Sequence, residues 1–292
     1  MYNRGKIIPV TPNYSLMSPT IHILCNSLAN QGSAAAAVSQ IRSALAGYPD
    51  ITWHETTHPR HAADLAVQAA HLGAERLIIA GGDGTIHETV NGLMSLPASQ
   101  RPLVGILPIG SGNDFAASLQ IPLQLDSALQ VALGNSIRSI DIGSLSDDQG
   151  RCEYWSNTMG IGFDAVTIIH SKNIHLLKGF PMYFYAVMKT IFFNRTPMQA
   201  RMELDGKEKD IHILFLCLCN GRQEGGGFLI APHAQQDDGY FDLLAVKIIS
   251  RLRMLATLPH IIKGTHGNLD YTLHERFQRM QFTSDAPLII QT

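Results

Sequence analysis

Two glycine-rich segments in the first half of the chain carry residue types that bind phosphate. The first, residues 81–85 (GGDGT), follows the apolar run 76–80 and precedes a helix-like run, 86–94. Glycine lets a backbone approach a ligand without a Cβ in the way, and a helix start offers free N–H groups to an anion. A carboxylate at Asp83 is unfavourable beside phosphates, because both are negative, unless it binds a metal ion, a ribose or a proton. A purely structural interpretation would make the same segment a turn with an aspartate helix cap.

The second glycine-rich segment is residues 107–115 (LPIGSGNDF), which follows the strand-like run 103–107. Asn113 or Asp114 would cap the next helix in a purely structural turn. That interpretation does not explain two such loops at neighbouring strand ends, where parallel sheets bind their ligands. Neither segment is a Walker A or G-x-G-x-x-G pattern. The pair of loops therefore favours one nucleotide lying across both.

The elements that must position these loops alternate between strand and helix. The predicted strands are 21–26, 51–56, 76–80 and 103–107, and the predicted helices are 33–45, 62–72, 86–94 and 125–133. Such alternation predicts a doubly wound α/β domain, a mostly parallel sheet with helices on both faces.

From about residue 140 the pattern changes to strands separated by turns. The predicted strands are 138–142, 154–161, 198–204, 211–220, 240–249 and 279–282, with one helical interruption at 174–193 and another after Ser250. We expect a second, β-rich antiparallel domain. The predicted organisation is a loose leader (1–20), an ATP-binding α/β domain (21–137), a β-rich lipid and metal domain (138–284), and a last segment (285–292) that can return to the first domain.

Composition limits the functional classes. The 292 residues are 45% hydrophobic and 16% charged, with a formal net charge of −2, which offers no overall electrostatic footprint for nucleic acid. The sequence contains no apolar run long enough for a membrane span and no signal-peptide core in residues 1–20. We interpret Cys25, Cys152, Cys217 and Cys219 as reduced core residues of a cytosolic protein.

Further motifs in the second half give the two loops a family context. They are residues 157–165 (NTMGIGFDA), then 220–222 (NGR), 225–227 (GGG), 231–232 (AP) and 237–242 (DDGYFD). With the two glycine loops, in this order over residues 21–292, they resemble the diacylglycerol kinase catalytic-domain family, which includes bacterial lipid kinases and the sphingosine and ceramide kinases. The resemblance implies an NAD-kinase-like first domain, a β-rich second domain and ATP in the cleft between them.

The resemblance also implies site residues. It places ATP on Asn26, Asn30, Thr56, Gly82, Asp83, Gly84, Thr85, Ile86, His87, Glu88 and Ser111. Residues 26–32 (NSLANQG) depart from the family's Asn-Pro-x-Ser-Gly turn, which often has a lysine nearby. The magnesium-bearing loop of the family matches the side chains of Gln235 and Asp238 and the carbonyl of Tyr240; few protein oxygens plus water suit Mg²⁺. An ordinary Asp-Gly hairpin turn is the structural alternative.

The end of the sequence bears on catalysis. The family's catalytic base lies in an Asp-Gly-Glu segment near the C-terminus, and residues 286–292 match the approach to it. The expected glutamate therefore falls beyond Thr292, and Asp83 is a candidate within the sequence. For the aromatic-rich stretch 176–193 we favour packing against the sheet over an interfacial lipid-binding helix.

These features predict an ATP- and Mg²⁺-dependent lipid kinase, which acts at the membrane surface and most simply converts diacylglycerol to phosphatidic acid. One alternative is a nucleotide-binding protein or truncated kinase without catalysis, because the expected Asp-Gly-Glu is absent. An NAD-kinase-like enzyme is a weaker alternative that shares the GGDGT loop. The sequence leaves room for a homodimer, peripheral to the membrane.

Overall fold

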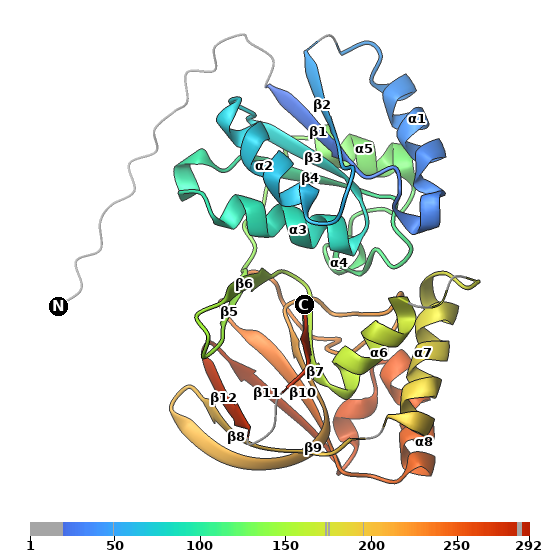
Figure 1. The fold of residues 1–292 in the computed structure, drawn as a ribbon, viewed down its shortest axis with the longest axis vertical. Helices are drawn as coiled ribbons and strands as arrows, with labels where there is room; N and C mark the ends of the chain where they lie inside the picture. Colours follow the sequence, from blue (N-terminus) through green and yellow to red (C-terminus); the bar gives the residue numbers. More distant parts are fainter. Residues whose placement is uncertain (1–19, 49, 173, 175, 195, 285–287) are drawn as a thin grey trace, which may run out of the picture.

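The computed structural model describes residues 20–292 except 49, 173, 175, 195 and 285–287, so nearly all of the predicted leader lies outside the described residues. The chain forms two bodies that lie one above the other, with the carboxyl ends of the first body's strands directed toward the second (Figure 1). The two glycine-rich loops and the last residues of the chain lie where the two bodies meet.

The first body is built on a four-stranded parallel sheet in the order β2-β1-β3-β4. Its strands are β1 (Ile21–Cys25), β2 (Ile51–Glu55), β3 (Arg76–Gly81) and β4 (Leu103–Pro108). Every residue of β1 and β3 is buried, because a parallel sheet covered on both faces needs apolar side chains in both directions. The predicted strands are confirmed to within a residue at each end.

Helices cover both faces of this sheet, as predicted. The side chains of α1 (Ala34–Ala44) and α5 (Leu125–Leu133) pack with Ile23 and Ile78 on one face. Those of α2 (His61–His71) and α3 (Asp83–Met94) pack with Leu24 and Leu77 on the other face. Adjacent strand residues point to opposite faces, so one apolar run serves two helical layers. A short helix, α4 (Asp114–Ser118), follows the second glycine loop, and 3-10 turns lie at Asn30–Gly32 and Ala98–Gln100.

The second body contains a seven-stranded antiparallel sheet. Its strands are β7 (Thr158–Gly162), β8 (Met198–Leu204), β9 (Lys207–Cys219), β10 (Phe241–Lys247), β11 (Thr272–Phe277), β12 (Met280–Ser284) and β13 (Ile290–Gln291). Three helices, α6 (Phe163–Lys172), α7 (Gly179–Phe193) and α8 (Arg251–Ile262), pack on one face, where their apolar residues meet β9 and β10. A hairpin of β5 (Gly143–Ser146) and β6 (Cys152–Trp155) sits beside α3, and a 3-10 turn lies at His266–Asn268. The predicted antiparallel β-rich domain is confirmed.

Several predicted boundaries were wrong. Residues 138–142 form no strand, because their backbone is held by a loop of the second domain: the Asp141 N–H donates to the Gln236 carbonyl at 2.6 Å. The run 154–161 is two strands, β6 and β7, broken at residues 156–157. The helix predicted over 174–193 begins only at Gly179, whose φ of +58° separates α7 from the preceding segment. Helix α6 was not predicted from the sequence. Cys152 is exposed and so is no core residue, whereas the other three cysteines are buried free thiols.

The last residues belong to the second sheet. Ile290 in β13 lies opposite Ile161 of β7, and the hydroxyl of Thr292 lies 3.4 Å from Nε2 of His87 in α3. The last segment therefore does not join the first domain as predicted but touches it through Thr292. Among the described residues, no helix is long and apolar enough to span a bilayer.

Candidate active site

A cleft of about 770 Å³ lies between the two bodies. Ten of the eleven predicted nucleotide residues line it, from the ends of β1, β2, β3 and β4: Asn26, Asn30, Thr56, Gly82, Asp83, Gly84, Thr85, His87, Glu88 and Ser111. The second domain contributes the opposite wall, with residues of the hairpin, α6, α7 and the chain end. The structure therefore brings the predicted residues into one space, while their contact with a nucleotide stays a prediction.

The two glycine loops touch each other back to back. A Cβ added to Gly110 would lie 2.3 Å from the Cα of Gly82, so this contact tolerates no side chain. A Cβ on Gly84 would meet nothing within 4 Å, because Gly84 faces the open cleft. The glycines therefore have two different roles, one in packing the loops together and one in leaving room for a ligand.

The divergent turn after β1 is held by its own asparagine and by the second domain. The Asn26 side chain donates to the Thr85 hydroxyl at 3.0 Å and accepts the Leu28 N–H at 3.1 Å. The Lys178 ammonium donates to the Asn30 carbonyl at 2.9 Å. A basic side chain thus reaches this turn from the start of α7, 148 residues away in the sequence.

Three consecutive residues of α3 have different surroundings. Ile86 is 1% exposed in the core, its N–H donates to the Gly82 carbonyl, and it does not line the cleft. The structure therefore does not bring it together with the other ten predicted residues. His87 lies 2.8 Å from the Glu153 carboxylate of the hairpin. Glu88 accepts the Ala62 N–H at 3.3 Å, which satisfies one orphan donor at the start of α2.

Asp114, which is buried, and Asp83, which is partly exposed, form a carboxylate pair on the floor of the cleft. Asp83 accepts the Phe115 N–H at 2.9 Å, and both carboxylate oxygens of Asp114 accept the Gly226 N–H, at 2.9 and 3.0 Å. One oxygen of each lies 3.0 Å from the position of a Cβ on Gly112. Burial raises the pKa of Asp83, and burial, followed by the Asp83 charge, raises the pKa of Asp114 to about 7. Burial therefore favours the protonated form of both carboxyl groups.

Comparisons with known proteins decide the family. Residues 20–145 match the model of the diacylglycerol kinase catalytic domain, and residues 157–292 match that of the YegS C-terminal NAD kinase beta sandwich-like domain. A "Probable lipid kinase YegS-like" of Chromohalobacter salexigens is 36% identical over 225 residues, 77% of this chain and 70% of the relative. The chain belongs to the diacylglycerol kinase catalytic-domain family. It is a kinase.

Other relatives agree with this family assignment. A diacylglycerol kinase of Mycobacterium tuberculosis is 29% identical over 253 residues, 85% of this chain and 79% of that protein. The crystal structure of a diacylglycerol kinase from Bacillus anthracis superposes with a TM-score of 0.70 at 20% identity and covers 94% of this chain and 89% of the other. At that identity the likeness concerns the fold, which confirms the predicted two-domain architecture of this kinase.

A second carboxylate pair in the kinase lies behind the cleft wall, and sequence reasoning missed it. The Tyr183 hydroxyl lies 2.9 Å from Asp164 and 2.9 Å from Glu224. Burial raises the pKa of Asp164 to about 6 and that of Glu224, which also feels the Asp164 charge, to about 8. Asp164 belongs to the quoted NTMGIGFDA motif, but nothing in the sequence pattern joined it to Glu224.

The predicted magnesium residues lie outside the cleft. None of Gln235, Asp238 and Tyr240 lines it. The Asp238 carboxylate accepts the Tyr240 N–H at 3.0 Å and is ion-paired with Arg276. A metal ion at this loop would have to displace Arg276 from the Asp238 carboxylate. Magnesium at this loop stays a prediction.

Proposed function

We propose that this kinase transfers the γ-phosphoryl group of ATP to a lipid hydroxyl, most directly that of diacylglycerol, to give phosphatidic acid. The observation that carries the proposal is the cleft itself. Two glycine loops in contact at the ends of β3 and β4 border one space, and the carboxylates of Asp83 and Asp114 line it. Phosphoryl transfer requires phosphate positioning and charge placed at the reacting centre, and little covalent chemistry from the protein.

Each part of the cleft has a defined task in this proposal. Gly84 and the start of α3 receive the phosphates, because a helix N-terminus with no Cβ in the way favours an anion. Mg²⁺ carried by ATP would supply the positive charge that neutralises the phosphates. The acceptor hydroxyl forms a bond to the γ-phosphorus while the bond to the bridging oxygen breaks, and the hydroxyl proton goes to a carboxylate. Asp83 is the described candidate for that carboxylate, because it lines the cleft next to Gly84.

The lipid would reach the cleft at the mouth next to α7. Gly179 and Met182 line the cleft, and Leu176, just before α7, is 97% exposed. One face of α7 packs into the core through Tyr183, Ala186, Val187, Thr190 and Ile191, as favoured from the sequence. Its exposed face carries Tyr185 and Phe193, and aromatic and aliphatic side chains of this kind suit the interfacial region of a bilayer. We therefore place peripheral membrane contact at this side of the molecule.

The proposal is tested by phosphoryl transfer with three acceptor conditions: diacylglycerol in mixed micelles, NAD, and no acceptor. We expect labelled phosphatidic acid only with diacylglycerol. ATP consumption that is the same in all three conditions, or a product only with NAD, would overturn it. Nucleotide binding without any transfer would favour the non-catalytic alternative.

The position of the base is tested with the same assay. The 292-residue chain is compared with a form in which Asp-Gly-Glu follows Thr292, because Gln291 and Thr292 line the cleft. Faster transfer by the extended form, and its loss in a Glu-to-Gln variant of that form, assigns the base to the added segment. Equal transfer by both forms leaves Asp83 as the base.

A further inference from the structure

A cluster of metal-ligating side chains lies in the second domain, on the helix-covered face of its sheet. The register of β7 and β9 places Gly160 opposite Cys217 and Thr158 opposite Cys219, and side chains two residues apart share one face. Asp164, in the first turn of α6, lies over this face: a Cβ on Gly160 would come within 2.1 Å of its carboxylate. The absent side chain at Gly160 is therefore what admits the carboxylate next to the thiols.

The spacing of the ligand atoms suits a tetrahedral ion. Asp164, Cys217 and Glu224 each offer one atom, and these atoms all lie within 4.8 Å of one another. The Cys217 sulfur lies 3.6 Å from a Glu224 carboxylate oxygen and 3.6 Å from the Cys219 sulfur. With Zn–S bonds of about 2.3 Å and Zn–O bonds of about 2.0 Å, the edges of a tetrahedral site measure roughly 3.3–3.8 Å. The two sulfur distances already fall in this range.

The cluster lacks a positive partner. Asp164 is 3% exposed, Glu224 6% and Cys217 0%, and one carboxylate oxygen of Asp164 is buried with no hydrogen-bond partner. Among the described residues, neither Asp164 nor Glu224 has a lysine, arginine or histidine in an ion pair. Buried carboxylates are paired, protonated or bound to a metal. The unpartnered oxygen points to a group that is not part of the polypeptide.

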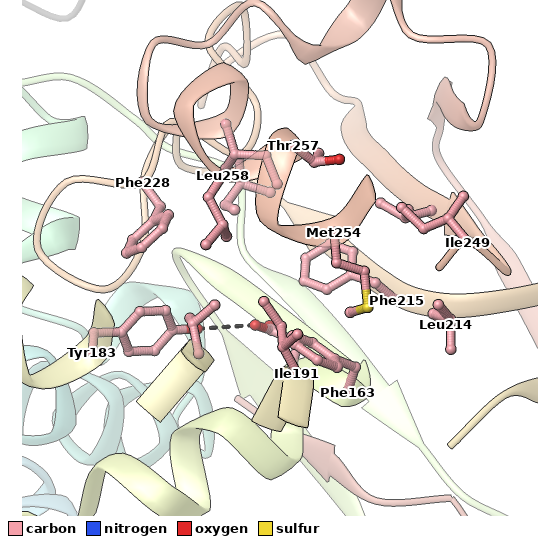
Figure 2. Close-up of a pocket in the computed structure, with 15 residues that line it drawn as sticks. Phe163, Tyr183, Ile191, Leu214, Phe215, Phe228, Ile249, Met254, Thr257 and Leu258 are labelled. Atoms are coloured by element: carbon pink, nitrogen blue, oxygen red, sulfur yellow. Dashed lines mark hydrogen bonds between the residues drawn. The ribbon is translucent and has the colours of Figure 1, made fainter. Parts of the chain in front are cut away.

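The surroundings are dry and supply a second shell. A small apolar cavity of about 60 Å³ borders the cluster, with Asp164, Tyr183 and Thr257 the polar residues among its lining side chains. Figure 2 shows Tyr183 projecting from α7 at one end of this cavity, and the dashed line marks its hydrogen bond to Asp164. A hydroxyl proton can serve one carboxylate at a time, so Tyr183 orients a ligand but cannot satisfy both. Partners of this type hold metal ligands in place.

We propose that Asp164, Cys217 and Glu224 bind a divalent transition-metal ion of the zinc class. Cys219 or a water molecule would complete the tetrahedron. Thiolate ligands select zinc-like ions over magnesium or calcium, so this site differs in chemistry from any site for the ion of ATP. The bound ion would fix residues 223–227, whose Gly226 N–H holds Asp114 at the cleft floor. It would thus act as a structural support for the kinase site.

The site can be tested without measuring activity. The full chain is freed of metal with a chelator and titrated with Co²⁺, whose thiolate-to-metal charge-transfer absorption reports sulfur ligation, and then with Zn²⁺ in competition; Mg²⁺ is a parallel titration. We expect one equivalent of Co²⁺ with thiolate absorption, displaced by Zn²⁺ and unaffected by Mg²⁺. Cys217→Ser should remove that absorption if water is the fourth ligand and reduce it if Cys219 is, and Glu224→Gln should weaken Zn²⁺ binding at least tenfold.

Cys152→Ser is the matched control, because Cys152 is exposed and lies in the separate β5–β6 sheet; it should bind as the parent does. Far-ultraviolet circular dichroism checks that each variant is folded. If Cys217→Ser does not fold, Glu224→Gln serves as the test variant, because it keeps the size of the side chain. The proposal is overturned if the parent protein shows no thiolate absorption, or if Cys152→Ser removes it. In that case the cluster is a pair of protonated acids in the core.

Discussion

The two carboxylate pairs of this kinase, one on the floor of the cleft and one behind its wall, are held differently. Asp83 and Asp114 accept backbone N–H groups, from Phe115 and Gly226, and border the open space. Asp164 and Glu224 meet around the Tyr183 hydroxyl, with thiols behind them. Backbone donors stabilise the charged form of a carboxylate. The first pair is therefore held in place by the protein and can still contact a ligand in the cleft. In the second pair the Tyr183 hydroxyl lies between the two carboxylates and the Cys217 thiol donates to Glu224, yet one oxygen of Asp164 has no partner in the described part of the chain. That oxygen can be satisfied by a proton or by a metal ion.

Hydrogen bonds connect the loop that carries Glu224 to Asp114 in the first domain. Gly226, two residues after Glu224, donates to Asp114 of the first domain. The Gln223 side chain donates to the same carboxylate at 3.2 Å. A change in the second pair can therefore reach the first through a few residues of one loop, and the following variants test how far the roles of the two pairs are separate.

The largest effect is expected at the first pair. Asp83→Asn removes the charge and the candidate proton acceptor, and general-base catalysis typically contributes about 10²–10⁴-fold. We expect lipid phosphorylation to fall at least a hundredfold, measured as labelled phosphatidic acid per minute. Asp126→Asn, an exposed aspartate in the first turn of α5, is the matched control and should retain the parent rate. An unchanged rate in Asp83→Asn would remove Asp83 from the chemistry.

The next effect is on stability against pH in metal-free protein. Because the folded pKa of Asp114 is about 7, the folded state keeps a proton between about pH 4 and 7 that the unfolded state has lost. The free energy of unfolding should therefore decrease as pH rises through this window, for this group by at most about 4 kcal/mol. Asp114→Asn should show a smaller decrease between pH 5 and pH 8 in urea titrations. Parallel curves for parent and variant would mean that Asp114 does not carry the shift.

A smaller effect is expected where the cleft is open. Gly84→Val adds a side chain that meets nothing within 4 Å in the protein, so the fold should be retained while the phosphates lose their place. We expect ATP to bind at least tenfold more weakly by calorimetry. Gly92→Ala is the opposite case, since its Cβ would lie 2.3 Å from the Ala63 carbonyl oxygen. It should cost about 1–3 kcal/mol in unfolding free energy and leave ATP affinity unchanged in the folded protein.

The smallest effect is expected at the aspartate loop outside the cleft. Arg276 is 51% exposed in its ion pair with Asp238, and exposed pairs contribute about 0–1 kcal/mol. Arg276→Gln should change stability by no more than this and should strengthen Mg²⁺ binding a few-fold, because it frees the carboxylate. Arg276→Gln combined with Asp238→Asn should not show that gain. Equal Mg²⁺ affinity in all three proteins would show that the Asp238 loop is no cation site.

Much of the architecture could be predicted because its signals are local. The strands β3 and β4 are mostly apolar runs, and a glycine loop follows each of them directly. The predictions failed where local pattern and long-range partners disagreed. Residues 138–142 alternate like a strand, but Asp141 pairs with Gln236, 95 residues away. Ile86 follows the loop closely, yet the helical turn points its side chain into the core.

The sequence by itself indicated the fold class, the strands and helices of the first sheet, the glycine loops and membership of the kinase family, because these depend on periodicity and on residues adjacent in the chain. Only the tertiary structure decided which carboxylates meet. Asp83 and Asp114 come from two strand ends, and Asp164 and Glu224 are 60 residues apart. Such pairing depends on strand register and helix packing, whose energies are spread over many residues. No spacing along the chain encodes it.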